Sequence, residues 1–382
     1  SNVWFTLQGG RTSEVFYPDL STPSVRSLEL WVTGKGVQDG PGDMTSTVQR
    51  PDPRSPRYTI VHEDEDGQYL LTETHVTDPR RDTYAVHVEL EELGRTDLDV
   101  QVRYDPALAN DGDDDRGRRV GHRLVAEDDR VSTALQGSTP LKGLRTTKGP
   151  DDVRQRARLP RDRMTVYLGF GRNARQATTA ARQSSKAGYA SLVAAYDNGW
   201  HRYLDGLKDV PSSAAGIEEE YLTSVMMVAA AEDKLNPGAV IASPSAPWVW
   251  GDNVPDLSKP SGAYHLVWSR DSYEFATALW AAGDRAAARR IADWLFAVQQ
   301  KKDGSFPQNS DVRGRPVWGE LQLDEVALPI VLAHLVGRDG RKNWPGIRKA
   351  ARFLVKFRDE ESGRRAPYSP QERWENQAAS SP

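Results

Sequence analysis

Residues 84–90 read YAVHVEL, and this stretch decides the fold of the first half of the chain. Large apolar side chains alternate here with smaller or polar ones. A period of two places one set on the core face of a β-strand and the other set in solvent. The set expected in the core is Tyr84, Val86, Val88 and Leu90. Residues 98–104, which read LDVQVRY, repeat the pattern.

Similar short runs, separated by Pro and Gly, extend in both directions from this stretch. Between the runs at 58–62 and 69–76, the pair Asp66-Gly67 is typical of a tight hairpin turn. Many short strands joined by such turns predict an antiparallel β-sandwich. We assign residues 1–172 to this sandwich and expect no catalytic residue in it.

The period of the apolar residues changes after this region. Residues 189–204 have helical spacing, and we expect a connecting helix near 176–208 within a helical linker, 173–212. The same spacing predicts further helices near 216–234, 271–283, 285–300, 321–337 and 344–358. The helix at 285–300 is expected to bury Ala288, Ile291, Ala292, Leu295 and Val298. Residues 213–382 are therefore predicted to form a second, helical domain.

The composition argues against several classes of protein. The chain has 382 residues and a net charge of -4, which argues against a nucleic-acid partner. It contains no run of 18 apolar residues, so no membrane partner is expected. The absence of cysteine excludes disulfides and thiolate sites. The 11 tryptophans favour contact with sugar rings, although most tryptophans are expected in a core.

Residues 264–271, which read YHLVWSRD, stand directly ahead of a predicted helix. Asp271 lies where a helix N-cap is expected, which would be a purely structural role. An Arg270–Asp271 pair flanked by Tyr264 and Trp268 is also suited to holding sugar hydroxyls, because charged partners form stronger hydrogen bonds than neutral ones. Both interpretations stay open at this point.

Two further segments place carboxylates near tryptophan. Residues 318–325 read WGELQLDE. The loop and the first helical turn can place Trp318 and Asp324 at the mouth of the same pocket; alternatively, Asp324 can lie on a solvated helix face. Residues 370–376 read PQERWEN, in which Glu375 follows Trp374. A carboxylic acid beside an indole in a partly dry site has a raised pKa, as a general acid needs. The alternative for Glu375 is an exposed, charged turn.

The acidic stretch 110–115, NDGDDD, could hold Ca²⁺ as a structural ion through its clustered oxygens. Its spacing does not match an EF-hand loop, and a solvated acidic turn is the favoured interpretation. The sequence lacks a phosphate-binding Gly-rich loop, a His-Glu-x-x-His zinc motif and a Gly-x-Ser-x-Gly elbow. We therefore expect no metal or cofactor in the chemistry.

In this order after a β-rich domain, the three segments resemble those of the bacterial glucoamylases and glucodextranases of glycoside hydrolase family 15. Residues 3–7 (VWFTL), 14–18 (EVFYP) and 77–82 (TDPRRD) are similar to the start of that family's sandwich. The resemblance implies an antiparallel β-sandwich followed by the first half of an (α/α)6 barrel over residues 213–382. It implies an inverting, exo-acting hydrolase that releases glucose from non-reducing ends of α-glucans, secreted from the cell or, alternatively, cytoplasmic.

The resemblance also implies roles for single residues. By position, Glu375 matches the general acid, and Arg270 with Asp271 matches the pair that holds the non-reducing glucose. The full set expected to bind substrate is Tyr264, Trp268, Arg270, Asp271, Trp318 and Asp324. Asn376 stands where the family often has a second acidic residue, so the resemblance does not extend to that neighbouring subsite contact.

Inverting glycosidases need two carboxyl groups roughly 6.5–9.5 Å apart, one as acid and one as base. The resemblance places the base in the second half of the barrel, after Pro382. We therefore expect that the chain is a fragment, that internal pieces are lacking, or that another chain completes the barrel. Two alternative functions remain: a sandwich-plus-barrel disaccharide phosphorylase and a non-catalytic carbohydrate-binding fragment. The α-1,4, α-1,6 and α,α-1,1 linkages are equally compatible with these segments.

Overall fold

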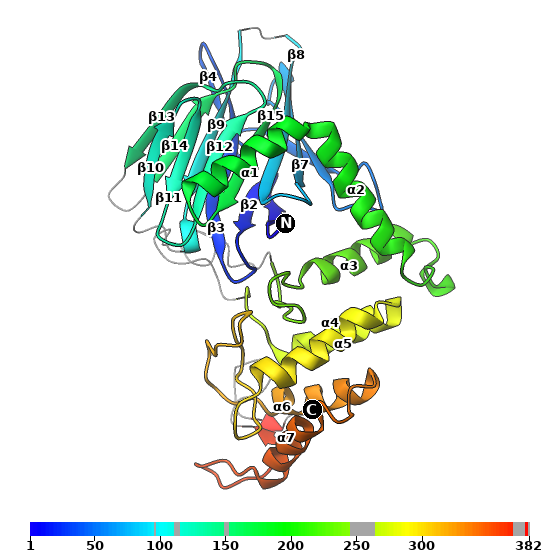
Figure 1. Cartoon of the computed structure of the whole chain (residues 1–382). Helices are drawn as coiled ribbons and strands as arrows, with labels where there is room; N and C mark the ends of the chain where they lie inside the picture. Colours follow the sequence, from blue (N-terminus) through cyan, green and yellow to red (C-terminus); the bar gives the residue numbers. More distant parts are fainter. Residues whose placement is uncertain (95–96, 111–114, 149–152, 245–263, 370–378, 381–382) are drawn as a thin grey trace. The chain divides into compact units, whose positions relative to one another are not determined.

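The computed structural model describes residues 1–94, 97–110, 115–148, 153–244, 264–369 and 379–380 (Figure 1). Its contacts divide the chain into two compact units. The first contains Ser1–Leu204, and the second contains Asp205–Pro244 and the described residues from Tyr264 onward. The domain boundaries near 172 and 212 remain predictions from the sequence.

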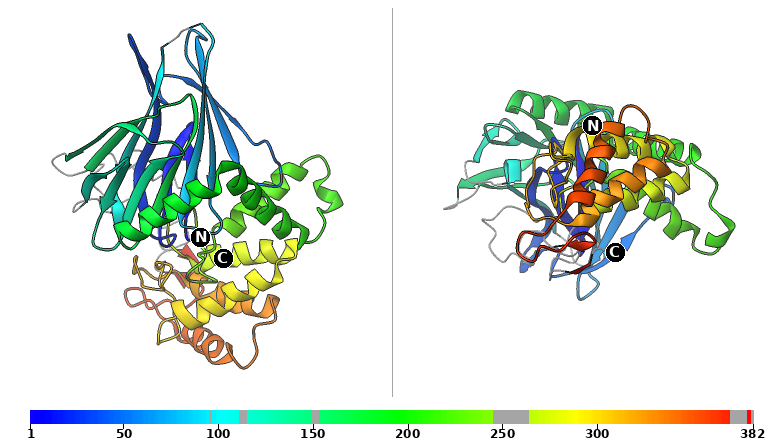
Figure 2. Two further views of the ribbon diagram at one scale, coloured as in Figure 1. Left: turned by 45° about the horizontal axis from the view of Figure 1, so that its top comes forward. Right: turned by 90° about the horizontal axis from the view of Figure 1, so that it is seen from below.

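The first unit is built on two antiparallel sheets that face each other across a shared apolar core (Figure 2). The first sheet has the order β1-β2-β3-β9-β14-β13, with β4 paired to β3. Its strands are β1 (Trp4–Gln8), β2 (Arg11–Phe16), β3 (Pro23–Gly34), β4 (Val37–Asp39), β9 (Asp99–Pro106), β13 (Lys142–Lys148) and β14 (Val153–Arg158). The second sheet has the order β10-β11-β12-β15-β8-β7-β6-β5. Its strands are β5 (Thr45–Gln49), β6 (Tyr58–Glu63), β7 (Tyr69–Thr77), β8 (Thr83–Glu92), β10 (Arg116–Val120), β11 (Arg123–Glu127), β12 (Ser132–Gly137) and β15 (Arg163–Gly171).

The alternating apolar residues meet between the sheets, as expected. The core side chains of β8 and β9 are Tyr84, Val86, Val88, Leu90, Val100, Val102 and Tyr104. The predicted hairpin also forms, because the Gly67 amide donates to the Asp64 carbonyl at 3.1 Å between β6 and β7. Gly67 has φ +64°, a conformation that glycine adopts without strain. The predicted antiparallel sandwich is therefore confirmed.

In the second set of β8 side chains, Ala85 and His87 do not face solvent, contrary to the expectation from the alternation, whereas the Glu89 side chain is 42% exposed as expected. Ala85 is buried in a small cluster with residues of two helices, α1 (Ala174–Ala187) and α2 (Tyr189–Asp205). The His87 ring stacks on Tyr189 with 4.1 Å between ring centroids. These helices cover the outer face of the second sheet in Figure 1. Gly188 separates them, so the connecting helix expected near 176–208 is two helices.

The second unit contains the helices predicted after residue 213. They are α3 (Glu218–Ala230), α4 (Ser269–Ala282), α5 (Arg285–Trp294), α6 (Leu323–Leu335) and α7 (Trp344–Lys356). A π-helical turn, Leu295–Gln299, extends α5, and a two-stranded ribbon joins β16 (Tyr368–Ser369) to β17 (Ala379–Ser380). Two short 3₁₀ helices, η1 and η2, occupy Leu108–Asn110 and Ser212–Ala214. In the described part of the chain, no helix is long and apolar enough to cross a membrane.

The π-helical turn corrects one predicted core position. Val298 was expected in the core, but it is 42% exposed. The Gln300 amide donates to the Leu295 carbonyl, five residues back, so this turn holds one residue more than an α-helical turn. That extra residue turns Val298 outward, while Gln299, which is 2% exposed, lies in the interior.

The crossing of α1 over β15 gives a test of the sandwich. A Cβ added at Gly169 would collide with the Ala177 carbonyl oxygen and lie 2.5 Å from the Ala181 amide nitrogen. We expect Gly169→Ala to lower the free energy of unfolding by about 1–3 kcal/mol, as overpacking typically does. Gly199, inside α2, has nothing within 4 Å of an added Cβ. Gly199→Ala should raise that free energy by about 0.5–1 kcal/mol, because alanine favours the helix.

Urea unfolding followed by circular dichroism measures both changes in the same protein. Equal effects of the two substitutions would contradict the close approach of α1 to β15.

Candidate active site

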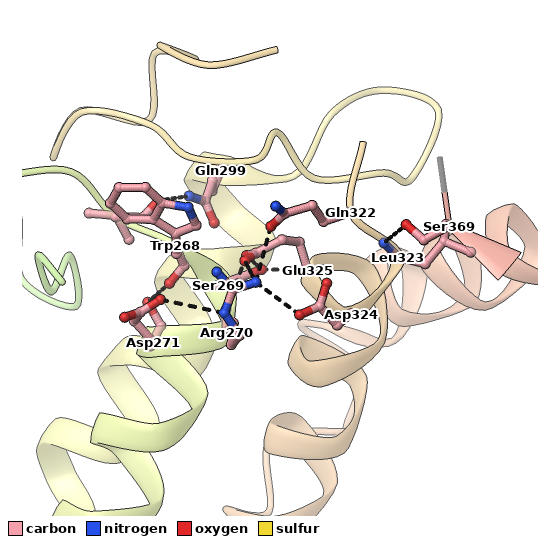
Figure 3. A network of polar contacts seen from close by, with 12 residues as sticks. Trp268, Ser269, Arg270, Asp271, Gln299, Gln322, Leu323, Asp324, Glu325 and Ser369 are labelled. Carbon is pink, nitrogen blue, oxygen red and sulfur yellow. Dashed lines mark hydrogen bonds and ion pairs between the residues drawn. The ribbon is translucent and has the colours of Figure 1, made fainter. Parts of the chain in front are cut away.

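The first turns of α4 and α6 bring a group of charged side chains together around one arginine (Figure 3). Arg270 Nη1 lies 2.9 Å from Asp324 Oδ2 and 3.0 Å from Glu325 Oε1. The same nitrogen donates to Gln322 Oε1 at 3.0 Å. Asp271 Oδ2 lies 3.9 Å from Arg270 Nε. The structure thus brings together Arg270, Asp271 and Asp324, three residues that the sequence marks as substrate-binding candidates.

Helix starts explain why these residues face one another. α4 begins at Ser269 with Trp268 in the N-cap position, so the expected N-cap role of Asp271 is wrong. Asp271 lies instead within the first turn of α4, where the helix dipole favours a negative charge. α6 begins after Gln322, and its first turn contains two acidic residues. The solvated face considered for Asp324 is also wrong, because its side chain is 7% exposed.

Glu325 is the partner that sequence reasoning missed. It is 0% exposed, and its Oε2 accepts hydrogen bonds from Ser269 Oγ at 2.5 Å and from the Arg270 amide at 3.0 Å. Glu325 thus contacts both the backbone and the side chain of Arg270. A signal was available, since the helix that follows, VALPIVLA, is apolar and leaves little polar surface for a carboxylate.

The charges in this group are unequal, because three carboxyl groups surround one guanidinium. Burial raises the pKa of Glu325 to about 8, against the opposing effect of Arg270. Burial likewise raises the pKa of Asp271 to about 6, again opposed by Arg270. Burial alone would lower the pKa of Arg270, but Glu325 and Asp324 outweigh it and the pKa is raised. The guanidinium therefore stays charged while Glu325 keeps a proton near neutral pH.

Three aromatic rings lie on the loops that lead to this group. Tyr264 stacks on Trp268 with 5.7 Å between ring centroids, and Trp268 meets Trp318 edge-on at 5.5 Å. Trp268 is 2% exposed, whereas Tyr264 is 36% exposed. We call these three residues the aromatic cluster. Its middle ring is buried, and Tyr264 presents the most open surface.

Several candidates lie outside the described residues. They are Glu375 with its neighbours in the segment 370–378, and residues 111–114 of the acidic stretch. The described residues on both sides of the first segment pair with each other, Ser369 with Ala379. Ser369 Oγ accepts a hydrogen bond from the Leu323 amide, at the start of α6, at 3.3 Å. Among the residues that the structure does describe, no group of three or more His, Cys, Asp or Glu side chains could hold a metal ion.

The raised pKa of Glu325 predicts how the stability depends on pH. Between its ordinary pKa near 4.5 and about 8, the folded protein holds a proton that the unfolded chain has lost. The stability that Glu325 contributes is fully present below this pH range, and it is lost as the pH rises through the range. Glutamine mimics the protonated form at every pH, so Glu325→Gln should gain stability over the parent as the pH rises from 5 to 9.

The melting temperatures of Glu325→Gln and of its parent, measured from pH 5 to 9, give the difference in stability between the two proteins. Glu320→Gln, at an exposed position in the loop ahead of α6, is the control and should show no such trend. A gap between Glu325→Gln and its parent that stays constant from pH 5 to 9 would contradict the raised pKa.

Comparison with known protein families finds a match for each of the two units. The family model "Glucodextranase, domain N" matches residues 1–149 and 141–205. The model "Glycosyl hydrolases family 15" matches residues 217–308. A glucoamylase of Clostridium sp. (strain G0005) is 33% identical over 415 residues, which cover 100% of this chain and 57% of that protein.

Solved structures agree with this assignment. A bacterial glucoamylase complexed with acarbose matches with a TM-score of 0.89 and 31% identity, over 99% of this chain and 59% of that chain. A family 92 α-mannosidase from Bacteroides thetaiotaomicron matches at a TM-score of only 0.40 and 12% identity, over 91% of this chain and 51% of that chain. The chain thus spans less than two thirds of the two glucoamylases. The expected sandwich followed by part of an (α/α)6 barrel is confirmed, and the chain belongs to the glucoamylases and glucodextranases of glycoside hydrolase family 15.

Proposed function

We propose that the protein hydrolyses the terminal α-glucosidic bond at non-reducing ends of α-glucans and releases glucose with inversion. The observation that carries this proposal is the Arg270–Asp271 pair at the start of α4, held by α6 beside the aromatic cluster. Family membership supports the same reaction class, and the two similar proteins are both named as glucoamylases.

The arginine has donors left for a sugar. The hydrogen bonds that join its side chain to α6 are made by Nη1, so we assign Nη2 to the sugar hydroxyl. The side chains of Arg270 and Asp271 are 18% and 29% exposed, so both can be reached from solvent. A guanidinium N–H and a carboxylate oxygen side by side can bind two hydroxyls of one glucose. Such charge-assisted hydrogen bonds are about twice as strong as neutral ones.

The aromatic cluster supplies the apolar part of the proposed site. Tyr264 has the open ring, and the C–H face of a sugar can pack on it. Trp268 lies behind Tyr264 and is buried, so we assign it the role of support. Trp318 contacts Trp268 from the side and extends the apolar wall.

Glu375 is the proposed general acid, which protonates the leaving glycosidic oxygen. Support comes from its position after Trp374 and from the flanking residues Ser369 and Ala379, which are paired to each other near the start of α6. A base must activate water on the opposite face of the sugar. We propose that this base comes from a part of the family's catalytic domain that the present chain does not span.

The reaction type can be tested with the protein expressed from its natural reading frame. Proton NMR of a maltose or isomaltose digest should show β-glucose first, because inversion changes the anomeric configuration. Activity should not depend on inorganic phosphate. A strict phosphate requirement would instead support the phosphorylase, and comparison of the two disaccharides would establish the preferred linkage.

The acid can be tested by Glu375→Gln, which keeps the shape of the side chain and removes the transferable proton. We expect kcat on maltose or isomaltose to fall at least about 10²-fold with little change in KM. A glucosyl fluoride should lose much less, because fluoride needs little protonation to leave. Glu372→Gln is the matched control three residues earlier. Loss of activity in the control, with near-normal kcat in Glu375→Gln, would assign the acid to Glu372.

A further inference from the structure

We propose that Gln299 is a positioning residue for the sugar site: the π-helical turn at the end of α5 aims its amide at the two loops that carry the aromatic cluster and holds those loops together. This inference rests on the proposed function, because it assigns the cluster to substrate binding. Gln299 itself would touch no substrate.

The amide of Gln299 joins two segments that are far apart in sequence. Its Nε2 donates to the Val267 carbonyl at 2.8 Å and lies 3.0 Å from Ser310 Oγ. Val267 and Ser310 also bond to each other through their backbones, at 2.8 Å and 3.0 Å. The side chain of Gln299 therefore hydrogen-bonds to the Val267–Ser310 backbone bridge, which joins the loop ahead of α4 to the loop ahead of α6.

Each end of that bridge leads directly to a ring of the cluster. Val267 precedes Trp268, the central ring. Ser310 follows Asn309, whose Oδ1 accepts a hydrogen bond from the Trp318 amide at 3.0 Å. Asn309 also accepts from the Val317 amide through its carbonyl, at 3.2 Å. The edge-on contact between Trp268 and Trp318 thus depends on the relative position of two loops, and Gln299 contacts both.

The helix deviates from α geometry at the place where this contact is made. With uninterrupted α-helical spacing, Val298 and Gln299 would both lie on the buried face, three and four residues after Leu295. The π-helical turn removes Val298 from that face and leaves the amide of Gln299 to meet the bridge. π-bulges of this kind occur frequently at functional sites.

The orientation of the Gln299 amide and the free-energy cost of its buried, unpaired oxygen both support a functional role. The Val267 carbonyl only accepts hydrogen bonds, so the NH₂ side of Gln299 must face it. Its Oε1 is then buried without a hydrogen-bond partner in the described part of the chain. An unpaired buried acceptor destabilises a protein, and such a group in a native structure needs an explanation. Positioning of the two loops is the explanation that the contacts give.

The test compares Gln299→Met, which keeps volume and removes the hydrogen bonds, with Val298→Ala at the exposed neighbour. Near-ultraviolet circular dichroism reports the Trp268–Trp318 contact without any substrate. Kinetics on maltose or isomaltose, with the protein expressed from its natural reading frame, report the sugar site. We expect Gln299→Met to change the tryptophan signal and to raise KM about tenfold, because displaced rings would pack less closely on the sugar, with kcat little changed. Val298→Ala should change neither.

Ser310→Ala removes one of the two partners of the Gln299 amide. It should shift the tryptophan signal and KM in the same direction by a smaller amount. This second variant tests the proposal even if Gln299→Met does not fold. A lower melting temperature with an unchanged tryptophan signal, or with unchanged KM, would overturn the proposal, because the role would then be structural only. If the unsubstituted protein hydrolyses no glucoside, the proposed function fails. The tryptophan signal then still decides whether Gln299 positions the cluster.

Discussion

The site depends on one half-buried guanidinium that joins two helix starts. A charged group that loses part of its contact with water needs a partner, and Arg270 finds its partners at the start of α6. Asp324 and Gln322 bind its Nη1, and Glu325 binds both its side chain and its backbone. This arrangement determines where α4 and α6 begin relative to each other. It therefore determines where the loops ahead of both helices can run.

The remaining features of the site follow from that arrangement. The loop ahead of α4 carries Tyr264 and Trp268, and the loop ahead of α6 carries Trp318, so two elements joined by one arginine also bring the rings together. Gln299 adds a second connection between the same loops. Three carboxyl groups surround one positive charge, and burial raises the pKa of Glu325, the most buried of the three, so that it keeps a proton near neutral pH. The partly exposed side chains of Arg270 and Asp271 are the polar groups that such a site offers to a sugar.

The sequence predicts the parts of this structure that depend on local periodicity, and it misses the parts that depend on tertiary contact. Period-two alternation predicts the sandwich correctly, but it cannot show that helices cover Ala85 and His87. Helical spacing predicts α5 but not the π-helical turn that exposes Val298, because one extra residue leaves the preceding pattern unchanged. Asp271 looked like an N-cap because the helix start was placed two residues too late. Glu325 was missed because its partners lie 55 and 56 residues away along the chain. The role of Glu375 remains a prediction from the sequence motif.

The most direct test of the account is the kcat/KM for maltose or isomaltose of Arg270→Lys, with the protein expressed from its natural reading frame. Lysine keeps the charge but lacks the planar fork that can bind α6 with one nitrogen and a sugar with the other. Loss of one charged hydrogen bond, worth about 1.5–3 kcal/mol, predicts a fall in kcat/KM of about 10- to 150-fold. Arg341→Lys, at an exposed position, should have no effect. A folded Arg270→Lys protein with the kcat/KM of its parent would contradict the claim that this guanidinium organises the sugar site.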